Sequence, residues 1–302
     1  MENGKLGFTL TKNQKDFLEN AIALVVKDIL EKKELRNLDN DFVAEKVKKY
    51  IDAHKKIKEK IKQTDKDNFK RLQRAKEYKE LVKGVRAELR EIYGVFILKG
   101  YKKLPKLLEE LKKDPSIANH NKILKLHKSS KERLPFYPII YKKMFEITGK
   151  PKRIIDLACG LNPFSYPYLE CEPEYIAYDL AQKDLDYIKE YFGIMEIKGI
   201  VKKIDLLNLD KSNLCEIGRK NDLVLLLKTV DSLETIKRNI SQEVLESIKA
   251  DNVVVSFSSI SIGGRKAIKK EKRAWFEKLV DRLGYKFVVF EVPGEIFYIL
   301  SK

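Results

Sequence analysis

Cysteine and histidine are scarce in this chain, with three of each among its 302 residues. The cysteines are odd in number and never spaced as Cys-x-x-Cys, which excludes a disulfide framework and argues against a thiolate metal site. They are Cys159, Cys171 and Cys215. The histidines form no helical pair that could ligate a metal. We therefore expect no bound metal, and we expect the cysteines to be small core residues.

Long apolar runs are absent as well. No stretch approaches the roughly 18 apolar residues that a membrane span requires. The first residues lack the basic start and apolar core of a secretory signal. The hydrophobic fraction of 43% is that of a globular protein. The sequence thus predicts a soluble, cytoplasmic protein without a membrane partner, and its length suits two domains.

Acidic residues are too few to balance the basic ones: 45 Asp+Glu stand against 62 Lys+Arg, for a net charge of +17. Residues 1–150 hold 38 Lys+Arg against 22 Asp+Glu, whereas residues 151–302 hold 24 against 23. A heat-adapted surface could also be rich in lysine, but there glutamate rises with lysine. The first half lacks that rise, so we expect a nucleic-acid-binding module joined to a nearly neutral catalytic or ligand-binding one.

The N-terminal part has apolar residues at helical spacing throughout. The pattern predicts helices over 12–33, over the apolar positions of 42–61, over 69–92 and over 104–111. Their Tyr and Phe residues fall on the apolar stripes, so we interpret them as core rather than as platforms for stacked bases. We therefore predict an all-helical, basic, RNA-binding domain over residues 1–125.

The second of these helices has the most basic polar face. Its lysines are Lys46, Lys48, Lys49, Lys55, Lys56, Lys58 and Lys60. We assign RNA binding to the last four, Lys55, Lys56, Lys58 and Lys60. The alternative is that these lysines form only a solvated face.

After about residue 150 the sequence pattern changes, and short β-rich runs alternate with helical ones. The candidate strands are 153–157, 175–179, 201–206, 222–227, 252–257, 287–292 and 296–300, with helices near 181–192, 232–249 and 269–283. Alternation of this kind predicts an α/β fold with a doubly wound parallel sheet. Only three residues separate the last two strands, so these must pair antiparallel. A seven-stranded sheet that ends in such a hairpin is the Rossmann-like plan of S-adenosylmethionine (SAM) methyltransferases, here expected over residues 126–302.

The stretch from Arg153 to Phe164 has the pattern of a strand, a tight turn through Ala158-Cys159-Gly160, and a helical turn at Pro163. At the carboxyl end of a strand in an open α/β sheet, backbone N–H groups in such a turn can approach a nucleotide-like ligand. Only one glycine is present where a dinucleotide loop would have more. An ordinary strand-to-helix turn therefore remains an alternative to a cofactor cradle.

Acidic residues follow three successive predicted strands. Asp156 ends the first, Asp179 ends the second, and Asp205-Leu206 ends the third. An acid at the second strand end can accept hydrogen bonds from a cofactor ribose. Asp205 could offer an acceptor, and Leu206 an apolar wall, to an adenine ring. The alternative for each aspartate is the capping of the next helix.

Several segments resemble, in unbroken order, the aminoglycoside-resistance methyltransferases that modify guanine N7 in small-subunit (16S) ribosomal RNA. They are His127-Lys128-Ser129-Ser130-Lys131-Glu132-Arg133, Cys159-Gly160-Leu161-Asn162-Pro163, Leu225-Leu226-Leu227-Lys228, Val255-Ser256-Phe257, Ser261-Ile262-Gly263-Gly264-Arg265, Trp275-Phe276-Glu277 and Glu295-Ile296-Phe297-Tyr298-Ile299. Two departures lie among them: Lys128 replaces an alanine of the family, and the stretch before Trp275 lacks the family's Met-Glu-x-x-Tyr.

The resemblance implies SAM as cofactor and assigns roles to residues. Arg133 would hold the SAM carboxylate, as a guanidinium can do with two bonds, unless it forms only a surface salt bridge. Asp179 would bind the ribose and Asp205-Leu206 the adenine. The full cofactor set is His127, Arg133, Asp156, Ala158, Cys159, Gly160, Asn162, Asp179, Leu180, Asp205, Leu206, Leu227 and Lys228. The residues expected to position the target base are Lys228, Ser258 and Arg265.

The implied reaction needs no general base, because guanine N7 carries an exposed lone pair that can attack a methyl group directly. A separate basic helical domain suits a folded phosphate surface, so we expect methylation of the assembled small ribosomal subunit. Two alternatives stay open. One is a SAM methyltransferase for another RNA base or another RNA, and the other is an RNA-binding or ribosome-assembly factor without turnover.

Overall fold

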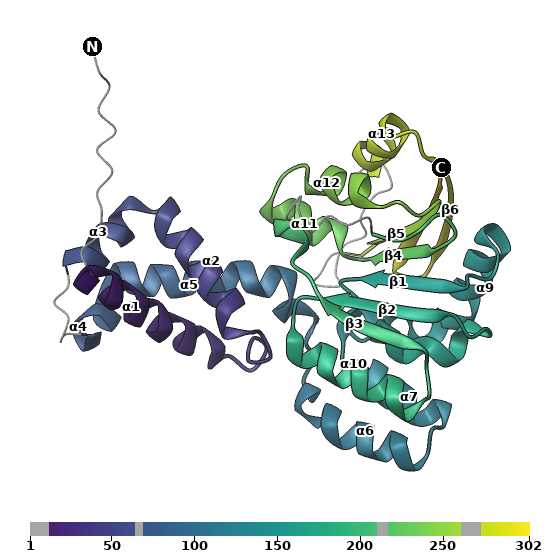
Figure 1. Ribbon diagram of the computed structural model, residues 1–302, viewed down its shortest axis with the longest axis horizontal. Coiled ribbons are helices and arrows are strands. Elements are labelled where there is room, and N and C mark those ends of the chain that lie inside the picture. Colours follow the sequence, from purple (N-terminus) through teal and green to yellow (C-terminus); the bar gives the residue numbers. More distant parts are fainter. Residues whose placement is uncertain (1–11, 64–68, 210–216, 261–272) are drawn as a thin grey trace. The chain divides into compact units, whose positions relative to one another are not determined.

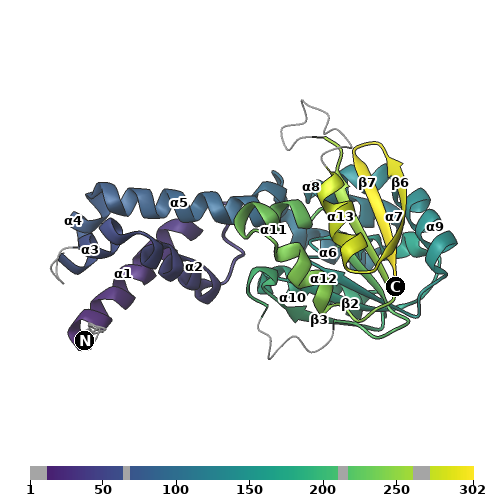
Figure 2. The same cartoon turned by 90° about the horizontal axis from the view of Figure 1, so that it is seen from above.

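The computed structural model describes residues 12–63, 69–209, 217–260 and 273–302 (Figures 1 and 2). The chain forms two compact units, Met1–Gly94 and Val95–Lys302. In the described residues no helix is long and apolar enough to cross a membrane.

The first unit is all-helical in its described part. Its helices are α1 Lys12–Leu30, α2 Asn40–Ala53, α3 Lys55–Gln63, α4 Phe69–Arg74 and α5 Lys76–Ile92. Helix α5 contacts each of the other four. Apolar residues at helical spacing close the space between them, and Val43, Val47, Leu81, Val85 and Leu89 are fully buried. The predicted core role of the aromatic stripe is confirmed at Phe17, Phe42 and Tyr78, which are all buried.

Two of the predicted helices are each interrupted once. The helix expected over 42–61 breaks at His54, whose backbone is extended and whose Nδ1 lies 2.7 Å from the Tyr50 carbonyl oxygen. The helix expected over 69–92 breaks at Ala75, which is also extended. Residues on both sides of the first break are buried, such as Ile51 and Ile57. Apolar periodicity continues across one extended residue, so the pattern alone could not show the breaks.

The short helix η1 Gly94–Phe96 spans the boundary between the units. The helices that follow it in the second unit are η2 Tyr101–Lys103, α6 Leu104–Lys113, α7 Ile117–Leu124, α8 Lys128–Arg133, η3 Leu134–Phe136 and α9 Tyr137–Thr148. Helix α6 packs on α7 and α10 Gln182–Ile194, and α7 packs on η4 Asn162–Leu169. Their leucines share one core with the sheet. The division between compact units thus falls after Gly94, ahead of the boundary expected after residue 125, because α6 and α7 bury their apolar faces in the second unit.

The second unit is built on a seven-stranded sheet with the order β3-β2-β1-β4-β5-β7-β6. The strands are β1 Arg153–Leu157, β2 Glu174–Asp179, β3 Gly199–Lys203, β4 Leu223–Leu227, β5 Asn252–Ser258, β6 Lys286–Val292 and β7 Glu295–Ser301. The first five are parallel, and β7 runs antiparallel between β5 and β6. The doubly wound sheet and its closing hairpin are therefore confirmed.

Helices cover both faces of the sheet (Figure 1). Helices α6, α7 and α10 lie on one side, and α11 Val230–Ile236, α12 Ile240–Ser247 and α13 Ala274–Arg282 lie on the other. The single helix expected over 232–249 is two, separated at Asn239, whose backbone is left-handed with φ 64°. Of the helix expected over 269–283, the part before residue 273 lies outside the described residues.

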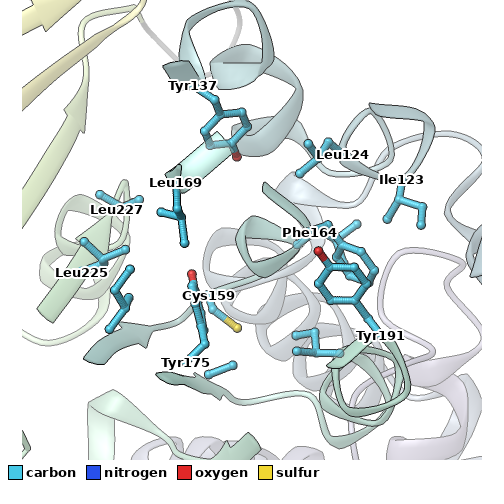
Figure 3. Close-up of a cluster of buried hydrophobic side chains, with 14 of the residues drawn as sticks. Ile123, Leu124, Tyr137, Cys159, Phe164, Leu169, Tyr175, Tyr191, Leu225 and Leu227 are labelled. Atoms are coloured by element: carbon cyan, nitrogen blue, oxygen red, sulfur yellow. The ribbon is translucent and has the colours of Figure 1, made fainter. Parts of the chain in front are cut away.

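The buried core of the second unit combines aliphatic side chains with large aromatic rings (Figure 3). Tyr137, Phe164, Tyr175 and Tyr191 are each at most 1% exposed. The ring centres of Phe164 and Tyr191 lie 4.4 Å apart. Four such large buried rings contribute strongly to the stability of this core.

Candidate functional site

The carboxyl ends of β1 and β4 meet at the point where the strand order reverses. From β1 the chain continues to β2 on one side, and from β4 it continues to β5 on the other. Open α/β sheets bind ligands in the crevice at such a switch point. The β1 turn lies there, with left-handed backbone at Ala158 (φ 53°) and Gly160 (φ 52°). This is the turn for which the sequence predicts a cofactor cradle.

The turn is tied to the end of β2. The Gly160 N–H donates to Asp179 Oδ2 at 2.8 Å, and the Cys159 N–H donates to the Tyr178 carbonyl at 3.0 Å. Asp179 Oδ1 also accepts from the N–H groups of Leu180 and Ala181, which precede α10. Burial raises the pKa of Asp179, and these donors oppose that rise. The Asp179 side chain therefore links the turn after β1 to the end of β2. It also accepts hydrogen bonds from the backbone just before α10.

Asp156 supports the turn from below. It is fully buried, and its Oδ2 accepts from Asn162 Nδ2 at 2.9 Å and from the Tyr175 hydroxyl at 2.7 Å. Its Oδ1 has no hydrogen-bond partner among the described residues. Burial raises its pKa to about 6, although the two donors lower it. Asp156 thus holds Asn162, the first residue of η4, in place.

A buried ion-pair network lies beside the turn. Arg133 Nε donates to Glu295 Oε1 at 2.9 Å and to Oε2 at 3.1 Å, and both side chains are 2% exposed. Lys228 Nζ lies 3.2 Å from Glu295 Oε2. The Ser256 hydroxyl also donates to Glu295. Four elements meet here: α8, the end of β4, β5 and the start of β7.

Glu295 is a site residue to which the sequence assigned no role. It appears in the resemblance only as the first residue of a segment similar to the family's last strand. The available signal was a glutamate directly after Pro293-Gly294 and before five apolar residues. A carboxylate at the start of a buried strand needs a cationic partner. That partner, Arg133, lies 162 positions earlier in the chain.

Arg133 is buried, which rules out the surface salt bridge considered as its alternative. Its Nη1 donates to Asn162 Oδ1 at 3.4 Å. Its Nη2 is buried and has no hydrogen-bond partner among the described residues. A buried guanidinium N–H without an acceptor is costly unless a ligand supplies one. A ligand carboxylate would be such an acceptor.

Lys228 follows β4 with a left-handed backbone at φ 56°. Its ammonium lies between two carboxylates, since Glu132 Oε2 accepts from it at 2.7 Å and Glu295 lies on its other side. Its N–H donates to the Ser256 carbonyl oxygen. A non-glycine residue in this conformation costs energy and often occurs at functional sites. The conformation sends a basic side chain back toward α8.

His127 packs against the other side of the turn. A Cβ on Gly160 would lie only 2.9 Å from the His127 ring, so the turn needs glycine at this position. The ring stacks on Phe96, with centres 5.6 Å apart. Burial lowers the pKa of His127 to about 3, and the nearby positive charge of Arg133 acts in the same direction. His127 is therefore neutral.

The remaining predicted site residues lie at neighbouring strand ends. The Ile204 N–H donates to the Asp179 carbonyl oxygen at 2.9 Å, so Asp205 follows closely after Asp179 in space. Asp205 caps η5 Leu206–Asn208 through the Leu207 N–H, which is the capping role considered for it. The third strand ends at Lys203, earlier than expected, because Asp205 and Leu206 belong to the start of η5. Leu206 and Leu227 are buried.

Of the residues expected to position the target base, Ser258 ends β5, and its carbonyl oxygen accepts from Arg273 at 3.1 Å. Arg265 lies outside the described residues. No group of three or more His, Cys, Asp or Glu side chains that could hold a metal occurs in the described parts of the chain. Cys159 is buried and Cys171 partly buried, while Cys215 is another residue that the structure does not describe.

The lysines expected to bind RNA lie on α3 in the first unit. Lys55 and Lys56 are exposed, and Lys58 Nζ lies 2.6 Å from Asp52 Oδ1. Lys46, which the sequence placed on the same basic helix face, is not exposed. Its side chain is 4% exposed, and its ammonium lies 5.2 Å from the centre of the Phe42 ring.

The sheet order and the closing hairpin, with polar side chains gathered at the switch point, are those of a Rossmann-like methyltransferase. The chain belongs to the family described as ribosomal RNA methyltransferase (FmrO), whose model matches residues 57–299. This confirms the resemblance seen in the sequence motifs.

Proteins of similar sequence carry names that agree with this family. The 16S rRNA (guanine(1405)-N(7))-methyltransferase of Proteus mirabilis is 32% identical over 206 residues, covering 62% of this chain and 71% of its own. The enzyme of the same name from Frankia casuarinae is 28% identical over 233 residues, covering 74% and 80%.

Solved structures share the fold. The 16S rRNA methyltransferase RmtF, in complex with S-adenosyl-L-homocysteine, has a TM-score of 0.73 at 23% identity and covers 97% of this chain and 100% of its own. The 16S rRNA methylase RmtB has a TM-score of 0.65 at 22% identity and covers 93% and 98%.

Proposed function

We propose that this protein transfers the methyl group of SAM to N7 of a guanine in 16S ribosomal RNA. The observation that carries the proposal is the family match over residues 57–299, to which relatives named as 16S rRNA guanine-N7 methyltransferases add the base and the RNA. The site agrees with it, because its polar groups lie at the switch point of the sheet.

The residues of the crevice fit SAM. The unpartnered Nη2 of buried Arg133 suits the carboxylate of the cofactor's methionine part. Asp179 stands at the end of β2, where a carboxylate can accept from ribose hydroxyls. We assign the adenine to Asp205 and Leu206. Bound SAM supplies an activated methyl group on a sulfonium centre.

The chain's own task is then to align the guanine rather than to move a proton. N7 attacks with a lone pair and loses no proton. His127 matches this task, because at a pKa of about 3 it is a weak base and its ring is packed against the turn. Alignment of reacting atoms can contribute roughly 7–11 kcal/mol to lowering the barrier. We assign base positioning to Lys228, Ser258 and Arg265.

The substrate in this proposal is the assembled small ribosomal subunit in the cytoplasm. The first unit is a separate helical body that carries exposed lysines, and it is larger than the recognition of one base requires. Folded RNA hides most base edges, so proteins read its phosphate surface and shape. The target guanine would be turned out of its stack at a cost of a few kcal/mol.

The test is incubation of the protein with SAM and either purified small subunits or free 16S RNA. A 7-methylguanosine is cationic, so reduction and aniline treatment cleave the chain at the modified position. We expect one new strand break, in RNA from subunits only. A methyl group on adenine or cytosine would contradict the base. Equal methylation of free RNA would contradict the assembled substrate, and SAM binding without turnover would support a binding factor.

A further inference from the structure

Helix α13 presents an exposed aromatic ring beside two cations. Trp275 is 39% exposed, and it is the single tryptophan of the chain. Lys278 and Arg282 follow it by three and seven residues, which places all three side chains on one face of the helix. Both cations are exposed. An exposed aromatic ring offers a face on which a nucleic-acid base can stack.

A cavity of about 220 Å³ lies along this face of α13. Trp275, Lys278 and Arg282 line one wall, and Glu234, Asn239 and Gln242 line the other. It is smaller than the roughly 300 Å³ or more of sites that enclose a drug-sized ligand. A cavity of this size suits one planar ring system held at the surface.

The second wall is held by hydrogen bonds of its own and by one bond to the first wall. The Glu234 carboxylate accepts from the Asn239 N–H at 2.9 Å and from the Ser241 N–H at 2.8 Å. Arg282 Nη2 donates to Gln242 Oε1 at 2.9 Å. The negative charge of Glu234 is thus partly compensated by the backbone, and the Asn239 side-chain amide adds a donor and an acceptor to the lining.

The start of α13 is anchored at the edge of the sheet that holds the methyl-transfer crevice. Arg273 Nη1 donates to Asp231 Oδ1 at 2.6 Å, just after β4, and its Nη2 donates to the Ser258 carbonyl at the end of β5. The Arg273 guanidinium lies 4.3 Å from the centre of the Phe257 ring. Trp275, two residues further on, is therefore near the carboxyl edge of the strands.

The ring of Trp275 is fixed by edge contacts. It meets Phe257 at an interplanar angle of 81° and Phe276 at 74°. Neither of these two contacts is a parallel stack. Such a ring is held in place and still offers a surface to a flat partner.

We propose that Trp275, Lys278 and Arg282 bind an unstacked nucleotide of the target RNA, distinct from the guanine that receives the methyl group. The proposal rests on the function proposed above. Stacking on an aromatic ring suits any base, because every base has a π-face. The two cations suit the phosphates on either side, and the Asn239 amide suits a base edge. Two like charges beside one ring favour a polyanion over a protein surface.

The single tryptophan makes the test direct. Its fluorescence can be excited selectively at the red edge of its absorption, so the unaltered full-length protein reports on this site. We expect a single-stranded oligoribonucleotide to quench the fluorescence with saturation, and a blunt duplex of equal length to quench it far less. Absence of quenching, or equal quenching by the duplex, would overturn the proposal.

Variants separate the site from general charge. The double variant Lys278→Ala/Arg282→Ala should raise the Kd for the single strand about tenfold and reduce its salt dependence, by up to about 0.7 in the log-log slope for each phosphate that the variant no longer binds. The double variant Lys183→Ala/Lys189→Ala on α10 removes the same charge from exposed positions and serves as the control. Equal effects of the two double variants would overturn the site.

Trp275→Ala removes the fluorescent ring, so its affinity is measured with a labelled single strand. This variant should raise the Kd for the single strand at least tenfold and leave SAM affinity unchanged. Trp275→Phe should restore part of the affinity for the strand. Methylation of small subunits by the unaltered protein tests the proposed function separately. Methylation without quenching overturns only this site, whereas quenching without 16S methylation sustains the site and overturns the function. Fluorescence that depends on protein concentration alone would indicate a second copy on this face and would contradict an RNA site.

Discussion

At the scale of single residues, Glu295 is the centre of the buried network. Its carboxylate faces the Arg133 guanidinium, the Lys228 ammonium and the Ser256 hydroxyl. Together with Glu132, which also accepts from Lys228, it sets two carboxylates against the two cations. Removal of one partner from a buried ion pair leaves an uncompensated charge, which costs more than the pair itself contributes.

Glu295→Gln should therefore lower the free energy of unfolding by about 3–5 kcal/mol. The measurement is denaturant unfolding followed by the fluorescence of Trp275, which reports on the second unit. Glu246→Gln, at an exposed position of α12, is the matched control and should stay within about 0.5 kcal/mol of the unaltered protein. A Glu295→Gln variant as stable as the control would show that the network is not a stabilising element.

Asp179→Ala should weaken SAM binding by about 1.5–3 kcal/mol, on the order of 10- to 100-fold, because ribose hydroxyls lose a charged acceptor. Stability should also fall, since the Gly160 and Leu180 N–H groups lose theirs. Calorimetric titration measures the affinity. Asp186→Ala, an exposed aspartate on α10, should bind SAM normally. Unchanged affinity in folded Asp179→Ala would remove the ribose assignment.

The raised pKa of Asp156 predicts a pH dependence of stability. The folded protein holds the proton up to a pKa of about 6, above the usual value of 3.8. The stabilisation by this proton is complete below about pH 4 and is lost as the pH rises toward 6, with a slope of at most about 1.4 kcal/mol per pH unit.

Asp156→Asn supplies the comparison, because both donors converge on Oδ2 and one amide oxygen can accept from both. We expect the difference in unfolding free energy between the two proteins to change between about pH 4 and 6 in favour of the variant, and to be flat above that window. A difference that is constant across the window would mean that Asp156 has an ordinary pKa in the folded protein.

At the scale of elements, the β6–β7 hairpin delivers Glu295 to the network. Val292 pairs with Glu295, so the turn consists of Pro293 and Gly294 alone. Gly294 has φ 86°, and a Cβ there would meet only the end of Ile260 at 3.9 Å. Backbone conformation rather than space therefore requires glycine at this position.

Gly294→Ala should destabilise the protein by about 1–2 kcal/mol through backbone strain. Gly193→Ala is the matched control in α10, where the φ angle is not positive and nothing lies within 4 Å of a new Cβ. There the same change should stabilise by up to about 1 kcal/mol, because alanine favours a helix. Thermal unfolding of the two variants checks the opposite signs, and shifts of the same sign would disagree with this account of the hairpin.

At the scale of the whole molecule, the structure divides the positive charge differently from the sequence halves. Residues 1–94 hold 24 Lys+Arg against 17 Asp+Glu, net +7, whereas residues 95–150 hold 14 against 5, net +9. The second segment folds into the methyltransferase unit. The basic surface is therefore shared by both units, and each contains candidate phosphate-binding side chains.

A variant of α3 tests its share of RNA binding by replacing four lysines with alanine: Lys55, Lys56, Lys58 and Lys60. It should lower the slope of log RNA affinity against log salt by up to about 0.9 for each duplex phosphate that is no longer bound. SAM affinity should not change. The charge-matched comparison removes the exposed Lys102, Lys103, Lys106 and Lys112 of η2 and α6. A larger change in the second set would move the main RNA surface to residues 95–150, and no change in the first would make its lysines a solvated face.

Local patterns in the chain determined much of this protein. The seven strands, the closing hairpin and most of the helices of the first unit follow from the periodicity and spacing of residues close in sequence. The ordered motifs indicated the family through resemblance. The turn at Gly160 and the acids at Asp179 and Asp205 could be found in this way, because each directly follows a recognisable strand.

Only the tertiary structure decided which distant residues meet. The helix breaks at His54 and Ala75 leave the apolar period intact, and the burial of Lys46 depends on neighbours that its own helix does not reveal. The partnership of Arg133 with Glu295 spans 162 positions and exists only when β7 inserts beside β5. A buried charge is stable only when an opposite charge lies beside it, and the position of β7 in the sheet brings Glu295 to Arg133.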